Sequence, residues 1–261
     1  MLKSTILLQK RTKRSMNKAI IFDLDGTIYF GDTLAYYAQE LISELRCMGY
    51  EIIFFTNNST KTREEIFTKL NNLSIITNIE NVYTSAYATA IYLKQEKLMN
   101  IFLIGTDSFK SELNNFNIEV VDEMDAEAEA VVIGLDIEFN YTDIGKALIF
   151  VNNGAKIIAS NVDRNYPVEN NALKPGSNAI VSSLLGACDN KGVDFIVGKP
   201  NTFLLEIICK DFNLKKDNIW VIGDSYASDI AMANNYACKS VLVDQNNNLE
   251  TVLNIIKEGN K

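Results

Sequence analysis

The sequence predicts an α/β fold in which helices cover both faces of a parallel sheet. Short runs rich in β-branched and aromatic residues alternate with stretches of helical periodicity along the chain, as they do in βα units. Several of the short runs are apolar at every position, which is typical of strands buried on both faces. The predicted strands cover residues 19–23, 51–56, 81–85, 101–105, 130–135, 156–161, 195–198, 219–223 and 240–244.

Two of the predicted helices have clear boundaries in the sequence. Apolar residues recur at helical spacing over residues 34–48, and Gly49 supplies the end of that helix. Thr62 followed by Glu65 has the spacing of a capping box, which opens a helix running to about Leu70. Each helix would return the chain to the start of the next strand, as a parallel sheet requires.

The composition restricts both the size of the fold and the chemistry available to it. The chain has 261 residues, 47% of them apolar, which is enough for one large domain or two modest ones. A formal net charge of -8 disfavours a nucleic acid polymer or an anionic membrane as a partner. The sequence contains no histidine, which excludes Ser-His-Asp triads and imidazole acid–base chemistry. Any catalysis must therefore use carboxylates, lysine, hydroxyls or a metal.

The cysteines and the N-terminal segment bear on the location of the protein. The four cysteines are scattered and form no CxxC pair, which favours a reduced cytoplasmic protein. No apolar run approaches the roughly 20 residues of a transmembrane helix. Residues 1–17 are basic, and we expect a disordered leader there, with a transit peptide as the alternative.

Polar motifs stand where four of the predicted strands end. They are Asp23-Leu24-Asp25-Gly26-Thr27, Thr56-Asn57-Asn58-Ser59, Gly198-Lys199-Pro200, and Gly223-Asp224-Ser225 with Ser228-Asp229. Because open α/β sheets bind ligands outside the carboxyl ends of their strands, we expect these motifs to converge on one site.

The acidic residues of these motifs need a cation if they converge. Two unit charges 4 Å apart repel by about 4 kcal/mol at an effective dielectric constant of 20. Oxygen ligands without sulfur or imidazole indicate Mg²⁺. Lys199 and Thr56 would then neutralise and orient phosphoryl oxygens. The predicted metal ligands are Asp23, Asp25, Asp224 and Asp229, the last being either a direct ligand or a partner of one.

Asp23 is predicted to be a nucleophile. A carboxylate with an ordinary pKa of about 3.9 is ionised at neutral pH and needs no base to activate it. Attack on phosphorus would give an aspartyl-phosphate, while Asp25 protonates the leaving alcohol and later accepts a proton from water. Two alternatives stay open: phosphotransfer to a second alcohol, or a non-catalytic receiver-like phosphoprotein. A receiver needs neither Asp25 nor a large insertion, so we favour an enzyme.

The complete motif set resembles the haloacid dehalogenase-like (HAD) hydrolase superfamily. The intact DxDGT signature at residues 23–27 is followed in the family's order by Thr56, Lys199, Asp224 and Asp229. The segments 56–59, 83–86 and 198–200 resemble its NagD or p-nitrophenyl-phosphatase-like branch. That resemblance implies a Mg²⁺-dependent phosphoric monoester hydrolase acting on nucleotide monophosphates, sugar phosphates or aryl phosphates. It also implies that Thr56, Asn57 and Lys199 bind the substrate phosphate.

The long gap between the second and third motifs predicts a second domain. Residues 57–198 are far too many for a loop. The resemblance implies a Rossmann-like, doubly wound core with an inserted α/β cap that selects the leaving group, and it allows a homodimer through the cap. We expect the leader at 1–17, the core at 18–86 and 178–261, and the cap at 87–177. The candidate substrate contacts of the cap are Asn161, Asp163 and Lys174.

Overall fold

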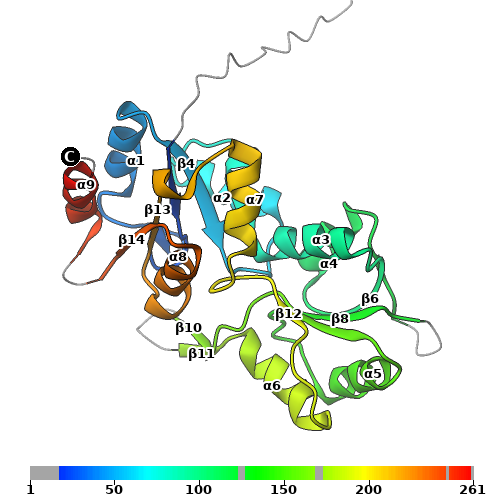
Figure 1. The fold of residues 1–261 in the computed structure, drawn as a ribbon. Helices are drawn as coiled ribbons and strands as arrows, with labels where there is room; N and C mark the ends of the chain where they lie inside the picture. Colours follow the sequence, from blue (N-terminus) through cyan, green and yellow to red (C-terminus); the bar gives the residue numbers. More distant parts are fainter. Residues whose placement is uncertain (1–17, 123–126, 168–172, 245–246, 260–261) are drawn as a thin grey trace, which may run out of the picture.

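The computed structural model describes residues 18–122, 127–167, 173–244 and 247–259. The predicted leader at 1–17 lies outside these residues. Two five-stranded sheets, each with all of its strands parallel, form the two lobes seen in Figure 1. The predicted α/β fold with a Rossmann-like core is confirmed.

The first sheet is built from both ends of the chain, with its earliest strand in the middle. Its strands in spatial order are β14 (Lys239–Leu242), β13 (Ile219–Gly223), β1 (Ala19–Phe22), β4 (Glu51–Thr56) and β5 (Val82–Thr84). In register, Ile21 lies between Val221 of β13 and Ile53 of β4. Every residue of β1 is buried, as its unbroken apolar sequence predicts.

Helices cover the two faces of this sheet. On one face Ile20, Phe22 and Phe54 belong to a core cluster with the apolar sides of three helices. These are α1 (Ala38–Cys47), α2 (Arg63–Asn72) and α9 (Leu249–Glu258). The opposite face is covered by α3 (Ser85–Glu96), α7 (Phe203–Phe212) and α8 (Ala231–Tyr236). The predicted capping box of α2 is present, with the Glu65 N–H donating to Thr62 Oγ1 at 3.1 Å.

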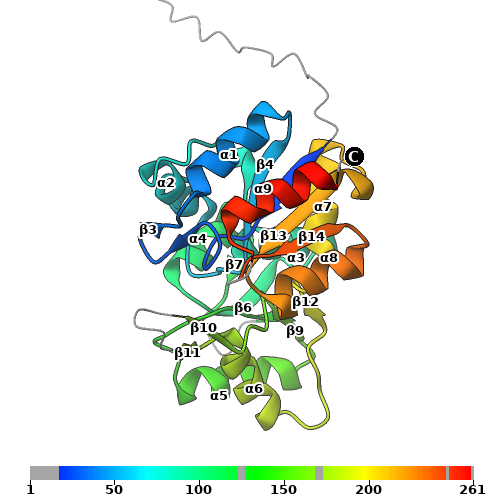
Figure 2. The ribbon, with the colours of Figure 1, turned by 90° about the vertical axis from the view of Figure 1, so that its left-hand side faces the viewer.

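The second sheet has the same number of strands and its own helices. Its strands in spatial order are β12 (Phe195–Ile196), β9 (Lys156–Ala159), β8 (Ala130–Ile133), β6 (Asn100–Ile104) and β7 (Glu119–Val120). Helices α5 (Tyr141–Asn152) and α6 (Ser177–Ala187) pack on the face that carries Phe102, Val131 and Ile157. The other face contacts α3 and α4 (Asp107–Asn114). Figure 2 shows α5 and α6 at the end of the molecule away from the first sheet.

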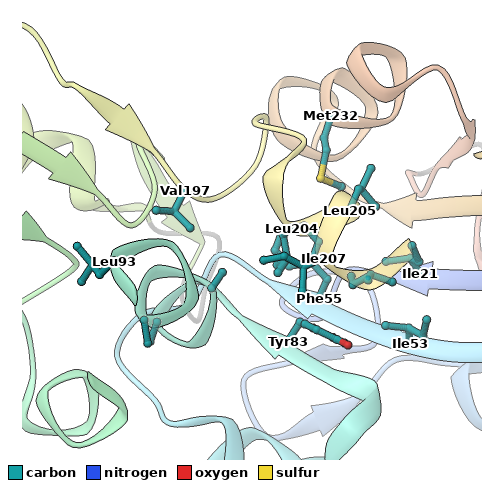
Figure 3. Close-up of a cluster of buried hydrophobic side chains, with 14 of the residues drawn as sticks. Ile21, Ile53, Phe55, Tyr83, Leu93, Val197, Leu204, Leu205, Ile207 and Met232 are labelled. Carbon is teal, nitrogen blue, oxygen red and sulfur yellow. The ribbon is translucent and has the colours of Figure 1, made fainter. Parts of the chain in front are cut away.

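One apolar cluster joins the two lobes. It contains Ile21 and Phe55 of the first sheet, Leu204 of α7, Leu93 of α3, and Val197 just after β12. Figure 3 shows Ile21, Phe55 and Leu204 on the side of the first sheet, and Val197 and Leu93 on the side of the second lobe. The two sheets therefore share a continuous core.

The structure adds short elements that the sequence pattern did not predict. They are the hairpins β2 (Tyr29–Phe30) with β3 (Thr33–Leu34) and β10 (Asn165–Pro167) with β11 (Leu173–Pro175), the edge strand β7, the 3-10 turns η1 (Ile79–Asn81) and η3 (Lys216–Asn218), and the π-helical turn η4 (Tyr226–Ile230). Two-residue strands such as β2 and β3 are too short to show a periodicity.

Candidate active site

The first and fourth motifs meet because β1 and β13 are neighbours in the first sheet. Asp23 directly follows β1, and its N–H donates to the carbonyl oxygen of Ile222 in β13 at 2.8 Å. Asp224 directly follows β13, and η4 then brings Asp229 beside the end of the strand. The Ser225 N–H donates to Asp229 Oδ2 at 3.0 Å, which holds this carboxylate in place.

Two glycines allow the acidic residues to approach this closely. A Cβ atom at Gly26 would overlap the carboxylate of Asp224, and Gly26 also has a φ of 91°. A Cβ atom at Gly223 would overlap the side chain of Asp229. Only glycine suits the space at both positions and the positive φ at Gly26.

Three carboxylates form a compact group at the centre of the site. One oxygen from each of Asp23, Asp224 and Asp229 lies within 4.8 Å of the other two. Asp23 and Asp229 are buried and Asp224 is exposed, so the group opens to solvent on one side. An all-oxygen donor set that leaves room for other ligands suits Mg²⁺. The described residues therefore include a donor set that fits this metal.

Lys199 supplies the cation inside the site. Its ammonium group is buried, donates to Asp229 Oδ1 at 2.7 Å, and also contacts Asp23 Oδ1. Its Nζ atom lies 4.8 Å from the centroid of the Phe55 ring. A single lysine is therefore shared by two buried carboxylates.

Burial and the neighbouring charges shift the pKa values of this cluster. Burial raises the pKa of Asp23, Lys199 lowers it, and Asp229 and Asp224 raise it further, with a net increase. Burial lowers the pKa of Lys199, but Asp229 and Asp23 outweigh burial and the net shift is upward. Burial and Asp229 also raise the pKa of Asp224. A cation beside Asp23 and Asp224 would counter the repulsion that causes part of these shifts.

Asp25 lies apart from the three-carboxylate group. Its Oδ2 atom accepts from Thr56 Oγ1 at 3.4 Å and from the Tyr29 hydroxyl at 3.5 Å. Although the residue keeps solvent exposure, desolvation by the surrounding protein raises the pKa of its carboxyl group, while Lys69 and Lys199 oppose that shift. A carboxyl group with a raised pKa is suited to donate a proton. The expectation that Asp25 also binds metal stays a prediction.

Asn57 follows Thr56 and makes its contacts within the protein. Its Nδ2 donates to both carboxylate oxygens of Asp163, at 3.1 and 3.0 Å, and to the carbonyl oxygen of Lys199 at 3.2 Å. Its Oδ1 accepts from the Lys199 N–H at 2.9 Å. The sequence assigned Asn57 to the substrate phosphate, and that role stays a prediction; the structure places its amide between two protein segments.

The predicted substrate contacts of the second lobe occupy two different places. Asn161 is buried and donates from Nδ2 to the Asn57 carbonyl oxygen at 2.7 Å, and Asp163 faces Asn57 as described above. Lys174 instead lies on the exposed strand β11, opposite Tyr166 of β10. Their contact with substrate stays a prediction.

Residues 57–60, here called the junction segment, connect the carboxyl edges of the two sheets. After each of three strands of the second sheet, the residue two positions beyond the strand end bonds to the junction segment. Asn161 after β9 donates to the Asn57 carbonyl oxygen, the Leu135 N–H after β8 donates to Ser59 Oγ at 3.0 Å, and Thr106 Oγ1 after β6 donates to the Thr60 carbonyl oxygen at 3.4 Å. The two edges therefore face each other across this segment.

Comparisons with known proteins agree with this geometry. One family model, described as haloacid dehalogenase-like hydrolase, matches residues 20–119, and another, described as HAD-hydrolase-like, matches residues 196–258. The sugar-phosphatase AraL of Bacillus subtilis is 34% identical over 229 residues, covering 86% of this chain and 82% of that protein. The chloroplastic phosphoglycolate phosphatase 1A of Arabidopsis thaliana is 31% identical over 248 residues, covering 87% and 68%.

Solved structures show the same similarity in three dimensions. A p-nitrophenyl phosphatase from Archaeoglobus fulgidus has a TM-score of 0.85 at 26% identity, covering 92% of this chain and 99% of that one. A putative nagD protein has a TM-score of 0.80 at 29% identity, covering 87% and 88%. A glycerol phosphate phosphatase from Mycobacterium tuberculosis, in complex with magnesium, has a TM-score of 0.78 at 26% identity, covering 87% and 68%.

The chain belongs to the haloacid dehalogenase-like hydrolase family. Within that family it is an enzyme of the phosphatase class, in the branch that contains NagD and the p-nitrophenyl phosphatases, as its motifs predicted. In the part of the chain that the structure describes, no helix combines the length and the apolar character needed to cross a membrane.

Proposed function

We propose that this chain is a Mg²⁺-dependent phosphatase that hydrolyses small phosphate monoesters through an aspartyl-phosphate on Asp23. The observation that carries the proposal is the group formed by Asp23, Asp224 and Asp229, with Lys199 held against two of its members. The names of the similar proteins support sugar phosphates, phosphoglycolate and aryl phosphates as substrates to test first.

Asp23, Asp224 and Asp229 would hold the metal. Their oxygens are close enough to share one ion, and the exposed side of Asp224 gives access to the group. When bound, Mg²⁺ would neutralise negative charge on the phosphoryl oxygens. The similar glycerol phosphate phosphatase was solved in complex with magnesium, which supports Mg²⁺ as the metal.

In the first half-reaction, an Asp23 carboxylate oxygen forms a bond to phosphorus as the bond to the leaving oxygen breaks. Lys199 opposes the effect of burial on Asp23, because the ammonium contact favours the charged form of the carboxylate, which is the form that attacks phosphorus. Asp25 transfers its proton to the leaving oxygen, so the product departs as a neutral alcohol. Thr56 and Tyr29 hold the Asp25 carboxyl group in position for this step.

In the second half-reaction, water attacks phosphorus and the bond to Asp23 breaks, which regenerates the free carboxylate. Asp25, now ionised, accepts the proton that the water loses. Thr56 lies beside Asp25 and Lys199 lies beside Asp23, so both are placed to bind the remaining phosphoryl oxygens. One carboxyl group thus serves as acid and then as base.

We propose that the second sheet and its helices form a cap over this site. The support is the set of three contacts between the junction segment and the ends of β6, β8 and β9. Because β12 pairs with β9 and α6 packs on the second sheet, we place the C-terminal boundary of the cap near residue 197 instead of 177.

Two features of the wider setting are also proposals. The four cysteines are free in the structure, which supports a reduced, cytoplasmic setting. For a homodimer through the cap, the support is the exposure of Ile137, shortly before α5, and of Tyr141, its first residue, at 76% and 88%. Sedimentation of the wild-type chain and of Ile137→Glu tests the dimer, which is excluded if the wild type sediments as a monomer.

The decisive experiment replaces the nucleophile. Asp23→Asn keeps the size of the side chain, and we expect it to lower kcat for p-nitrophenyl phosphate with Mg²⁺ by more than about 1,000-fold. Asp217→Asn, the same change on the exposed turn η3, is the matched control and should retain wild-type turnover. Folded Asp23→Asn enzyme that releases phosphate at the wild-type rate would refute the nucleophile assignment.

A further inference from the structure

The side chain of Asn57 is the only described side chain bonded to both backbone polar groups of Lys199. Its Oδ1 accepts from the Lys199 N–H at 2.9 Å, and its Nδ2 donates to the Lys199 carbonyl oxygen at 3.2 Å. Asn57 is 8% exposed and Lys199 is 2% exposed, so water does not replace these bonds readily. The amide therefore fixes the backbone from which the ammonium group reaches Asp23 and Asp229.

Asp163 determines which way the Asn57 amide points. Both of its carboxylate oxygens accept from Nδ2, at 3.1 and 3.0 Å. A flipped amide would place Oδ1 against this carboxylate and against the Lys199 carbonyl oxygen, and would place Nδ2 against the Lys199 N–H. All of these pairs would then be mismatched. One orientation alone satisfies both neighbours.

Asn161 and Ser177 of the second lobe support the positions of Asn57 and Asp163 through further hydrogen bonds. Asn161 Nδ2 donates to the Asn57 carbonyl oxygen at 2.7 Å, and Asn161 Oδ1 accepts from the Asp163 N–H at 3.1 Å. Ser177 Oγ donates to the Asn161 carbonyl oxygen at 3.0 Å. A Cβ atom at Gly198 would overlap Asn57 Oδ1, so glycine is required next to Lys199.

We propose that Asn57 is a positioning residue for Lys199, and that Asp163 of the second lobe orients it. The position of the second lobe thereby affects, through the Asn57 amide, the position of Lys199 beside Asp23. The inference rests on the proposed function, because it takes Lys199 to be the cation that assists phosphoryl transfer. It differs from a substrate contact, because both polar atoms of the Asn57 amide are used within the protein.

A double-mutant cycle tests whether Asn57 acts through Lys199. In the wild-type background, we expect Asn57→Ala to lower kcat/KM for p-nitrophenyl phosphate by about 10- to 100-fold. In a Lys199→Ala background, the same change should alter kcat/KM by less than about twofold, since no ammonium group is left to misplace. An equal loss in both backgrounds would overturn the proposal. Inactive wild-type enzyme would instead refute the proposed function.

A donor–acceptor exchange gives a second test that does not remove side-chain volume. Asn57→Asp sets two carboxylates against each other, and we expect kcat/KM to fall by about 100-fold. Adding Asp163→Asn restores a donor opposite the new carboxylate, so the double variant should recover at least about tenfold over Asn57→Asp. A double variant that is no more active than Asn57→Asp would overturn the role of Asp163.

Asn81→Ala is the matched control for loss of a buried amide. Asn81 is 3% exposed and donates to Glu51 Oε1 at 2.6 Å and to the Ile52 carbonyl oxygen at 2.7 Å, where β4 begins. It should lower the melting temperature while kcat/KM stays within about twofold of wild type. A similar kinetic loss in Asn81→Ala and Asn57→Ala would show that both act through general destabilisation, which would also overturn the proposal.

Discussion

The carboxyl edges of the two sheets face each other and differ sharply in charge. Both sheets have five parallel strands. The strands of the first edge lead into Asp23, Thr56 and Asp224, whereas those of the second edge lead into Gly105, Gly134 and Ser160. The second lobe bonds the junction segment through neutral groups after β6, β8 and β9 and through the carboxylate of Asp163. The same sheet architecture therefore carries the candidate active site at one edge and the contacts between the lobes at the other. The residues that follow the strands determine the role of each edge.

The two edges also differ in the groups that their side chains meet. At the second edge, Asn161 and Ser177 are bonded to neutral protein groups, and the buried Oγ atom of Ser160 has no hydrogen-bond partner among the described residues. At the first edge, Asp23, Asp224 and Asp229 lie together, and Lys199 forms ion pairs with Asp23 and Asp229. The remaining negative charge attracts a metal ion, at a cost in stability when no metal is bound.

The largest expected effect comes from the acid of the first edge. Asp25→Asn removes the proton donor, and we expect kcat for an alkyl or sugar phosphate to fall by about 100- to 10,000-fold. With p-nitrophenyl phosphate the loss should be much smaller, because p-nitrophenolate leaves without needing a proton. Steady-state assays with both esters measure this difference. Equal losses for the two esters would contradict the role of Asp25 as the acid.

A somewhat smaller effect is expected from the exposed member of the carboxylate group. Asp224→Asn removes a metal ligand, and we expect kcat/KM to fall by at least about 100-fold. Since Asp224 also repels Asp23 and Asp229, the variant should melt at a higher temperature than wild type in EDTA.

Asp224→Asn also tests whether the loss of activity is caused by the loss of the metal. Mg²⁺ should raise the melting temperature of the wild type and raise that of Asp224→Asn far less. Scanning calorimetry with EDTA and with Mg²⁺ measures both effects. An equal response to Mg²⁺ in the two proteins would place the ion elsewhere.

The smallest expected effect comes from a carboxylate of the second lobe. Glu112 on α4 is buried, and its Oε2 accepts from the Arg63 N–H at the start of α2 at 2.8 Å. Burial raises the pKa of Glu112 above its ordinary value of 4.5. The folded state therefore holds the proton more tightly than the unfolded state, and stability falls as pH rises from 4.5 through the raised pKa.

Glu112→Gln should remove this decrease of stability with rising pH. We expect the free energy of unfolding of wild type, relative to the variant, to decrease between pH 4.5 and 7. Kinetic constants at neutral pH should stay within about twofold of wild type, in contrast to changes at the first edge. Urea denaturation across this pH range gives the measurement, and parallel stability curves for both proteins would contradict the expected titration.

Much of the fold could be predicted from local sequence. The strand predicted at residues 19–23 is observed as β1, which ends one residue earlier, at Phe22. The strand predicted at residues 51–56 is observed as β4 with the same bounds. The partner of β12 could not be predicted, because a two-residue strand pairs with β9 through contacts that its own sequence does not specify. For the same reason, the boundary between the lobes had no local signal.

The centre of the site was more predictable than its surroundings. Asp23 and Asp224 directly follow buried apolar strands, so sheet geometry alone brings them to one edge. The partners of Asn57 could not be predicted, because an amide both donates and accepts and its sequence neighbours do not identify the groups it meets. A charged side chain restricts which groups can be its partners, whereas the partners of a neutral amide depend on the tertiary structure.

The apolar cluster shared by the two lobes has a consequence for how the protein unfolds. Leu93, Ile101 and Val132 belong to the same cluster as Ile21 and Leu204. Opening the second lobe as a unit would expose part of this cluster to water, so partial unfolding is opposed by the apolar area that it would uncover. We therefore expect a single cooperative heat-absorption peak. The two lobes could diverge in sequence among relatives only while they keep a matching apolar face.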